Sequence, residues 1–563
     1  MKIKEMTKPC VALAVAFCAV SPVSVSAQEE NPDHVFDVSS QLDIFNSAYR
    51  MLDAYYVDSL DAKKVVTTGI KAMFRSLDPY TEYFPKEEEE DLKMLTQAKY
   101  GGIGSIIRQM KDSTVIILEP YEGMPAAEVG LQAGDVLLRI DDNDLKGKTS
   151  SDVSTMLRGE PGTTFSLKFQ RPGEAKPRTV KITRQNIKMP CITYSGMLSG
   201  DGIGYINLNS FTNDCFPYVR KAVIALKEQG ARALVLDLRG NGGGALDQAV
   251  SIVNLFVEKG QTIVETKGKV SATHQVYETN DEPLDLNMPL VVLVNDNSAS
   301  ASEIVAGSLQ DLDRAVIIGT RTYGKGLVQA IRGLPYDANM KLTTAKYYIP
   351  SGRCIQEIDY NLRRNSSSDG KAKPTAAQDS IFYTKNHREV MSGRGIAPDI
   401  TVKHDTLQNI LIYLAEDDIL IKWATRYCQT HQRPATIDEF EITDADYADF
   451  KQAVIDGGFK FDRLSDSNLK QLKKVAQFEG YYDDAKAEFD ALEAKLQGNL
   501  EADLDRNQKD IRSIIALEIA KRWYFEAGAV KYSLRNDPDL DQAIEILNDK
   551  ARYNAILNPS TNE

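Results

Sequence analysis

The spacing of hydrophobic positions changes along the chain, and each change predicts a different kind of structure. Near the N-terminus, apolar residues such as Leu42, Phe45 and Leu52 recur three or four residues apart, which predicts helix. From about residue 100, short β-type runs between Gly and Pro turns predict a small, mostly β domain. Strand and helix patterns then alternate, and helical spacing dominates again beyond about residue 406.

The alternation in the middle of the chain predicts an α/β layer with a largely parallel sheet. Its predicted strands are Ile203–Leu208, Ala233–Leu238, Leu290–Val294 and Ala315–Ile318, and its predicted helices are Tyr218–Glu228, Ala245–Phe256 and Ser302–Leu309. The strands predicted in the β domain are Thr114–Leu118, Val136–Ile140, Thr164–Phe169 and Arg178–Ile182. The terminal helices are predicted at 41–52, 61–74, 469–478, 485–496 and 511–525. Residues 363–377, rich in Ser, Asp, Gly, Lys and Pro, predict an exposed loop.

The first 27 residues have the order of an export signal. Lys2 and Lys4 stand at its start, the apolar run Val11–Val20 comes next, and the small residues Val25–Ala27 follow that run. The run falls short of the roughly 20 apolar residues that span a bilayer, and so does every later stretch. We therefore expect cleavage after Ala27, a periplasmic or other extracytoplasmic location, and no integral membrane span afterwards. Association with the membrane surface stays open.

Composition narrows the possible partners. The 563 residues, 42% of them hydrophobic, predict roughly three or four domains. The net charge of −13 argues against nucleic acid or an anionic membrane as a partner, because both require concentrated Lys and Arg. Four cysteines follow the signal without CxxC pairing, so we expect no metal site, and their disulfide status stays open. They are Cys191, Cys215, Cys354 and Cys428.

A glycine-rich turn opens the β domain. Its backbone N–H groups can point into one hollow that holds a terminal carboxylate, while the next strand pairs with a peptide. Further on, Gly130–Leu131 and Gly134–Asp141 stand in the order seen in PDZ domains. The segment resembles a PDZ domain at 97–187, with a folded spacer whose groove stays empty as the alternative. The turn residues are Gly101, Gly102, Ile103 and Gly104.

Three serines lie between an apolar strand and a predicted helix. In the run 295–303, Ser298, Ser300 and Ser302 alternate with alanines at the positive end of that helix. A serine there can act as a nucleophile, because the N–H of Ala301 is free to bind a developing oxyanion. Each serine can equally cap the helix, and local sequence does not choose among the three.

A lysine flanked by glycines follows the strand Ala315–Ile318. Lys325 can be held in a desolvated loop, where its pKa falls and the neutral amine can take a proton. If the run is β, Gln329 shares a face with Lys325 and can orient it. The run 319–325 also matches the GxxxxGK part of a P-loop, but Gly326 replaces the Ser or Thr that would hold magnesium. We therefore do not expect a nucleotide site.

A third motif, Leu236–Gly244, ends a strand in a glycine cluster. Such a loop can supply a second backbone N–H to an oxyanion, or it can be a structural turn. A histidine base is the alternative to the lysine, and only His274 and His387 are formal candidates. Neither lies in a local pattern typical of a base.

Together and in this order, the PDZ-like segment, the glycine loop, the serine run and the lysine run resemble the carboxy-terminal processing, or tail-specific, serine proteases. The resemblance covers about residues 38–404 and includes Leu77–Pro79 and Gly395–Asp399. It implies that Ser300 is the nucleophile, Lys325 the general base and Gln329 the residue that orients the base. It also implies Gly243 and Ala301 as oxyanion donors and Arg158 as a sensor of bound substrate.

The chain departs from the family's pattern at Tyr80, where many members have His, at Gly242, where Pro is common, and at Cys354, where Ser is common. None of these positions lies on the implied proton path. The helical tail has no counterpart in the resemblance, and its role stays open between packing and dimerisation.

The expected fold class is multi-domain α+β. It comprises a signal at 1–27, a helical segment at 28–96, the PDZ domain at 97–187, a crotonase-like or ClpP-like α/β core at 188–404 and a helical domain at 405–563. The expected function is an exported serine endopeptidase that needs no cofactor and cleaves protein or peptide substrates recognised by their free C-termini, with a homodimer through helical segments as a possible assembly. The alternative is a non-catalytic PDZ-containing binding or scaffold protein.

Overall fold

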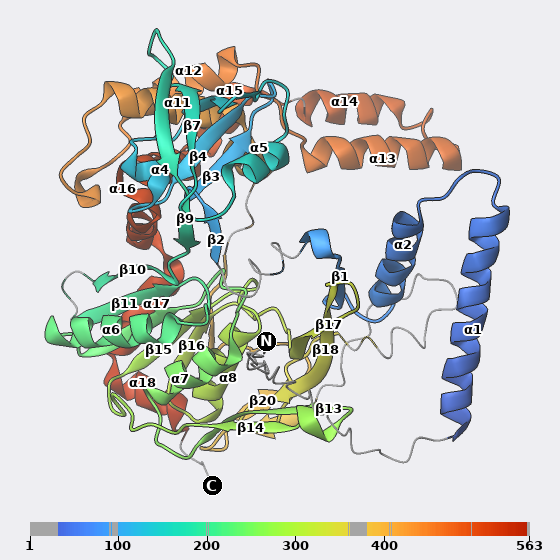
Figure 1. Ribbon diagram of the computed structural model, residues 1–563. Helices are drawn as coiled ribbons and strands as arrows, with labels where there is room; N and C mark the ends of the chain where they lie inside the picture. Colours follow the sequence, from blue (N-terminus) through green and yellow to red (C-terminus); the bar gives the residue numbers. More distant parts are fainter. Residues whose placement is uncertain are drawn as a thin grey trace, which may run out of the picture. The chain divides into compact units, whose positions relative to one another are not determined.

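The computed structural model describes residues 32–88, 92, 99–198, 200, 202–358, 360, 380–404, 406, 408–496 and 498–559. The predicted signal and the predicted loop at 363–377 lie outside these ranges. Tertiary contacts divide the chain into two units, one up to Met73 and one from Phe74 on. Figure 1 shows their elements, and each unit is described by itself.

The first unit is helical, as the N-terminal spacing predicts. Helix α1 (Pro32–Tyr55) is followed by α2 (Ala62–Arg75), whose last residues belong to the second unit. The apolar residues that predicted α1 do not form a core within the described chain. Leu42, Phe45 and Leu52 are between 46% and 57% exposed.

The PDZ domain is built on a sheet with the strand order β3-β4-β5-β7-β8, in which β6 pairs with β5. Its first strand, β3, lies at the edge of this sheet, and α5 lies against it. Strands β2 and β9 form a separate antiparallel pair. The elements are β2 (Lys99–Gly102), β3 (Ser105–Gln109), β4 (Val115–Pro120), α4 (Pro125–Glu128), β5 (Val136–Ile140), β6 (Asn143–Asp144), α5 (Ser150–Leu157), β7 (Thr164–Gln170), β8 (Arg178–Thr183) and β9 (Gln185–Lys188).

The α/β core contains a six-stranded sheet with the order β10-β11-β12-β15-β16-β21. All neighbouring pairs are parallel except β10 with β11, which confirms the predicted sheet type. Helices α6, α7 and α8 pack on one face of the sheet, and α17 and α18 from the end of the chain cover the other. The elements are β10 (Ile192–Met197), β11 (Ile203–Leu208), α6 (Cys215–Glu228), β12 (Ala233–Asp237), α7 (Leu246–Asn254), β15 (Leu290–Val294), α8 (Ala301–Asp311), β16 (Val316–Gly319), β21 (Ile400–Thr401), α17 (Pro538–Asn548) and α18 (Lys550–Leu557).

A second, antiparallel sheet completes the core, and the hydrophobic pattern did not reveal it. Its long strand β18 pairs with β1, β13 and β17, and β13 pairs with β14. Strand β1 falls in the segment predicted as helical at 28–96, so residues 82–84 of that segment belong to the core sheet. The strands are β1 (Glu82–Phe84), β13 (Thr262–Gly268), β14 (Gln275–Glu278), β17 (Leu327–Gly333) and β18 (Asn339–Tyr348).

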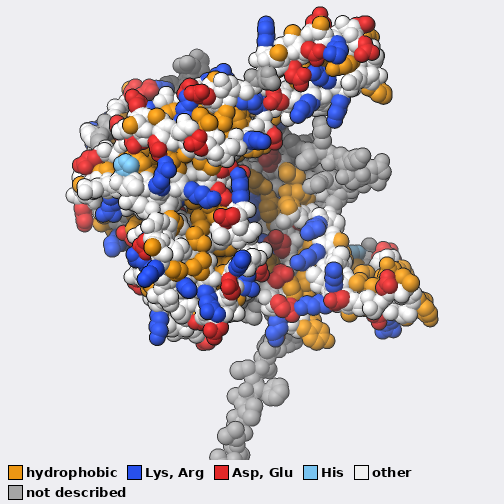
Figure 2. Space-filling view, turned by 90° about the horizontal axis from the view of Figure 1, so that it is seen from above, with side chains coloured by type: hydrophobic (Ala, Val, Ile, Leu, Met, Phe, Trp, Pro, Cys, Tyr) orange, Lys and Arg blue, Asp and Glu red, His pale blue; other side chains and the backbone are white. Residues whose placement is uncertain are grey.

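The helical domain that follows has a hydrophobic core of its own. It touches the PDZ domain, because Asp418 accepts a hydrogen bond of 2.7 Å from the backbone of Lys111, and Gln429 donates one of 2.7 Å to the Pro172 carbonyl. In the part of the chain that the structure describes, no helix is both long and apolar enough to cross a membrane. Figure 2 shows acidic and basic side chains interspersed over the visible face. The helices are α10 (Asn409–Glu416), α11 (Asp418–Thr430), α12 (Asp444–Asp456), α13 (Leu464–Glu479), α14 (Lys486–Leu496), α15 (Leu500–Arg506) and α16 (Gln508–Ser533).

Candidate active site

The structure separates the three serines that the sequence left equivalent. Ser298 and Ser302 are fully buried, and their hydroxyls donate to the carbonyls of Leu238 and Asn241, each at 2.8 Å. Both therefore hold the serine run against the glycine loop. Ser300 is only partly buried and lies immediately before the first turn of α8.

Ser300 also has an unusual backbone. Its φ is +57° and its ψ is −113°, a conformation that costs a residue with a side chain about 1–3 kcal/mol. Such outliers persist where the surrounding structure fixes them, and they are frequent at active sites. The sharp turn places Ser300 between the end of β15 and the N-terminus of α8.

Glu303 fixes this turn and the lysine loop together. Its carboxylate accepts the backbone N–H groups of Ser300 and Lys325, both at 2.8 Å. It also accepts the N–H of Gly324 at 2.7 Å and the hydroxyl of Thr322 at 2.6 Å. Glu303 is 0% exposed, so burial raises its pKa, while the four donors stabilise the ionised form.

A tyrosine makes a second link between the same two segments. The hydroxyl of Tyr347, on β18, lies 3.1 Å from the Ser300 carbonyl oxygen and 2.5 Å from that of Lys325. Tyr347 is 1% exposed, so these contacts are shielded from water. The backbones of the predicted nucleophile and base are thus held by Glu303 from one side and by Tyr347 from another.

The side chain of Lys325 is largely desolvated. Burial lowers its pKa below the usual value, and the positive charge of Lys341 lowers it further, whereas Glu303, Glu82 and Asp78 raise it. The Nζ atom lies 4.6 Å from the ring centre of Tyr80. Tyr80 therefore forms part of the pocket around the amine.

The glycine loop lies against Ser300. A Cβ atom on Gly243, whose φ is +98°, would come within 2.8 Å of the Ser300 Cβ and 2.9 Å of the Ala301 nitrogen. The Ala301 N–H, at the start of α8, has no acceptor among the described residues. The Gly243 N–H donates to Asn241 Oδ1 at 2.9 Å, so it serves an oxyanion only by exchanging this partner.

Gln329 lies on β17 but is not hydrogen-bonded to Lys325. Its amide donates to the Leu327 carbonyl at 3.3 Å and to the Thr343 hydroxyl at 3.5 Å. Strand β17 begins only at Leu327, after Lys325, and a register shift follows Val328. Simple strand alternation therefore does not place the two side chains on one face, and the orienting role stays a prediction.

The groups that a P-loop or a histidine base would use make other contacts in the structure. The N–H groups of Gly324 and Lys325, which would meet phosphate in a P-loop, donate to the Glu303 carboxylate instead. A ring nitrogen of His274 lies 2.9 Å from the Gly268 carbonyl oxygen, and His387 packs against Tyr383.

The PDZ residues form the expected turn ahead of β3. Gly101 accepts a hydrogen bond of 3.0 Å from Gly159, Ile103 is 3% exposed, and Gly102 ends β2. Gly104 has a φ of +69°, and a Cβ atom there would come within 2.5 Å of Met124. Arg158 ends α5, with its backbone N–H bonded to Ser154 at 3.0 Å, and its role as a sensor stays a prediction.

Comparisons with known proteins match three parts of the chain. The family described as peptidase family S41 matches residues 202–363, and the PDZ domain family matches residues 116–171. The family described as the C-terminal helical domain of probable PDZ-proteases matches residues 410–547. A carboxy-terminal-processing protease of Bartonella bacilliformis is 37% identical over 338 residues, which cover 59% of this chain and 77% of that protein.

This chain belongs to the carboxy-terminal-processing serine proteases of peptidase family S41. A probable CtpA-like serine protease of Staphylococcus aureus is 34% identical over 319 residues, which cover 56% of this chain and 63% of that protein. Among solved structures, a photosystem II D1 C-terminal processing protease matches 65% of this chain and 93% of its own, with 28% identity and a TM-score of 0.35. The match at 410–547 also assigns the helical tail, which the sequence motifs did not reach.

Proposed function

We propose that this family member is an exported serine endopeptidase that captures protein C-termini with its PDZ domain and cleaves with Ser300 as nucleophile and Lys325 as general base. The observation that carries the proposal is the Glu303 carboxylate, which binds the backbone N–H groups of both residues at 2.8 Å. The bond to the Ser300 N–H alone is one half of a helix capping box, whereas the bond to the Lys325 N–H brings the lysine loop to the same carboxylate.

In this mechanism the neutral amine of Lys325 removes the proton of the Ser300 hydroxyl as its oxygen attacks a peptide carbonyl. The N–H of Ala301 and one N–H of the glycine loop stabilise the oxyanion. As this intermediate collapses, the Lys325 ammonium returns its proton to the departing amine, the C–N bond breaks, and an acyl-enzyme with a neutral Lys325 remains. Water activated by Lys325 then hydrolyses the ester and restores Ser300.

Recognition of C-termini is supported by the open edge of β3. A strand at a sheet edge has unpaired backbone groups that an extended peptide can use, and α5 forms the other wall of such a groove. The turn at 101–104 lies at the end of this groove, where a terminal carboxylate would sit. Export is supported by the signal pattern of residues 1–27.

The test uses the chain without residues 1–27 and an unfolded substrate with an apolar C-terminus. Ser300→Ala and Lys325→Ala should each lower kcat/KM at least about a thousandfold. The exposed controls Ser467→Ala and Lys221→Ala should leave it unchanged. Amidation of the substrate's C-terminus should weaken cleavage by the unchanged protein. Equal cleavage by all variants would refute the mechanism, and peptide binding without any cleavage would favour the scaffold alternative.

We also propose that a second copy of the chain covers α1. The exposure of Leu42, Phe45 and Leu52 in a 24-residue helix supports this, because soluble proteins rarely leave such a row of large apolar side chains in water. Phe45→Glu should shift the mass measured by light scattering toward the monomer. An unchanged mass would contradict the proposed dimer.

A further inference from the structure

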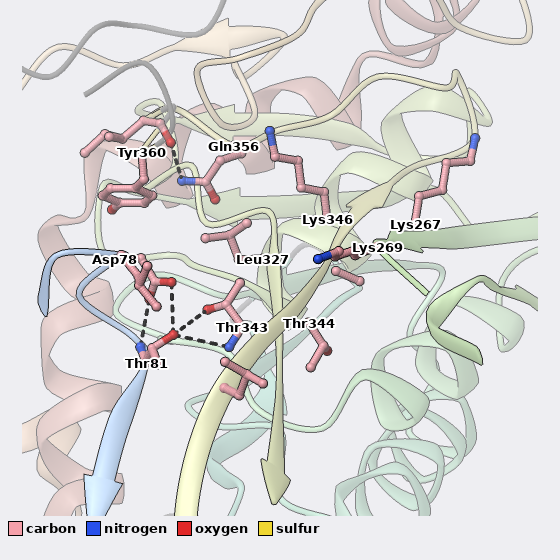
Figure 3. A pocket seen from close by; sticks show the side chains of 15 residues that line it. Asp78, Thr81, Lys267, Lys269, Leu327, Thr343, Thr344, Lys346, Gln356 and Tyr360 are labelled. Carbon is pink, nitrogen blue, oxygen red and sulfur yellow. Dashed lines mark hydrogen bonds between the residues drawn. The ribbon is translucent and has the colours of Figure 1, made fainter. Parts of the chain in front are cut away.

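A cavity of about 490 Å³ adjoins the loop that carries Lys325 (Figure 3). Leu327, two residues beyond Lys325, lines it, and so does Gln356, whose side-chain oxygen accepts the Gly326 N–H at 2.8 Å. Asp78 and Thr81, which flank Tyr80, line the opposite side. The cavity is therefore built from the same segments that surround the amine of Lys325.

The cavity coincides with a gap in the antiparallel sheet. Strand β17 covers one edge of β18, since Leu327 pairs with Lys346 and Gly333 with Asn339. On the other edge, β1 pairs with residues 339–341 and β13 with residues 345–348. Residues 342–344 of β18 thus have no strand partner on this edge among the described residues, although the Thr343 N–H donates to the Thr81 hydroxyl at 3.3 Å. The end of an extended peptide fits such a place once it displaces the Thr81 hydroxyl.

Three lysines gather on one side of the gap. Figure 3 shows Lys267, Lys269 and Lys346 on the side of the cavity away from Asp78, with their ammonium groups apart from one another, and the Lys267 Nζ lies 4.9 Å from the ring centre of Tyr348. Lys267 and Lys346 are direct partners in the antiparallel pair of β13 and β18. Like charges directly opposite each other destabilise a sheet, so this arrangement has a cost that a bound anion would offset.

The carboxylates of the protein do not balance these charges. Asp78 is the carboxylate among the residues that line the cavity, and its oxygens already accept the N–H groups of Tyr80 and Thr81 at 2.8 and 2.7 Å. Lys267 has a partner in Glu265 at 2.8 Å, although both side chains are well exposed. Lys269 and Lys346 have no carboxylate partner in the described part of the chain.

The remaining wall is apolar. Leu327, Leu342, Ala345 and Ile358 line it, so the cavity can receive the methylene stem of a side chain while the lysines meet its charged end. A chain with a net charge of −13 thus places a cationic and partly apolar pocket next to its proposed base. A carboxylate on a peptide is the ligand that matches both features.

We propose that this pocket is a specificity subsite that binds a carboxylate of the substrate peptide, either an acidic side chain near the scissile bond or the free C-terminus of the chain. The lysine pocket, formed by Lys267, Lys269 and Lys346, makes this enzyme prefer a substrate that carries a carboxylate at one position. The inference rests on the proposed protease function, but it concerns binding and is tested separately from catalysis.

The experiment compares peptides that carry Glu or Gln at each position around the cleaved bond, each with a free or an amidated C-terminus. The protein is the chain without residues 1–27, as wild type, as Lys267→Gln/Lys346→Gln, and as the control Lys221→Gln. At one position the Glu peptide should exceed the Gln peptide about tenfold in kcat/KM. This preference should vanish in the double variant and persist in Lys221→Gln. The preference should also shrink as salt rises, because the site is half exposed.

If amidation of the C-terminus lowers kcat/KM and an internal Glu has no effect, the pocket binds the C-terminal carboxylate. If an internal Glu raises kcat/KM and amidation has no effect, the pocket binds an acidic side chain. Lys346→Arg keeps the charge and should keep the preference, which separates a role in binding from a loss of folding. The same peptides are titrated onto Ser300→Ala by fluorescence anisotropy, so the pocket is tested even if nothing is cleaved. Kd and kcat/KM values that differ neither between Glu and Gln peptides nor between free and amidated C-termini, or a preference that survives in the double variant, would overturn the proposal.

Discussion

Two buried glutamates occupy opposite kinds of environment. Glu303, in α8, is 0% exposed and accepts four hydrogen bonds, three of them from backbone N–H groups. Glu119, at the end of β4 in the PDZ domain, is 7% exposed and faces α16 of the helical domain. No described residue donates a hydrogen bond to its carboxyl group.

The difference shows where the molecule is fixed and where it can respond. The donors around Glu303 favour a permanent charge that holds Ser300 and Lys325 in one geometry. Burial, together with the charge of Glu526, raises the pKa of Glu119 to about 7. Protonation near neutral pH therefore falls at the contact between the PDZ and helical domains.

The largest effect should come from Glu303→Gln. The carboxylate accepts its four hydrogen bonds with two oxygens, whereas a glutamine amide has only one acceptor oxygen. Loss of two hydrogen bonds to a buried charge should lower kcat/KM at least about a hundredfold. Enzyme kinetics and thermal unfolding are measured together, with the exposed Glu228→Gln as the control. Full activity with only a lower Tm would mean that Glu303 stabilises the fold without positioning the site.

The next prediction concerns the pH dependence of the fixed site. Because Lys325 must be neutral to act and its pKa is lowered, kcat/KM should rise about tenfold per pH unit and level off below pH 10.5. Lys341→Met removes a repelling charge and should move the midpoint up, whereas Glu82→Gln removes an attracting one and should move it down. A midpoint that neither variant moves would exclude Lys325 as the titrating base.

The sequence predicted the elements of the core well because they are locally encoded. The central strands of the parallel sheet, such as β15, are apolar runs, and β11 and β15, like β5 of the PDZ domain, have the predicted bounds. The second sheet was missed because half-exposed strands such as β18 show no clear pattern. Strand β1 was hidden in a segment with helical neighbours, and only its pairing with β18 defines it.

The site was predicted only in part, because local motifs name its residues but contacts between distant segments complete it. The motifs named Ser300 and Lys325, but residue chemistry alone could not choose among three serines, since the choice depends on which hydroxyls the glycine loop occupies. Glu303 stood in the motif without an assigned role. A charged residue in the first turn of an otherwise mostly apolar predicted helix was a usable signal, because a buried charge requires partners. Tyr347 and Tyr80 approach the site from distant strands and loops, which no local pattern reveals.

Glu119 should make the free energy of unfolding depend on pH. A carboxyl with a raised pKa stabilises the fold at low pH, and this contribution is lost as the pH rises through about 7. Glu119→Gln should therefore be more stable than wild type by up to about 3 kcal/mol at pH 8.5, and the gain should disappear as the pH falls toward 4.5. Hydrogen exchange in β4 and α16 measures this difference in stability at each pH, with the exposed Glu122→Gln as the control. A difference that does not vary with pH would contradict the assignment.

The smallest expected effect concerns backbone strain at Ser300. Glycine adopts the φ of +57° at position 300 without a side-chain clash, so Ser300→Gly should be about 1 kcal/mol more stable than Ser300→Ala, although both should be inactive. Ser298→Ala should instead lose about 1 kcal/mol, because it removes one of the two donors to the Leu238 carbonyl and the acceptor of the Asn295 N–H. Thermal unfolding of the three variants decides the matter. If Ser300→Gly proves less stable than Ser300→Ala, the turn before α8 is relaxed, and the four hydrogen bonds of Glu303 then serve only to join the serine and lysine segments.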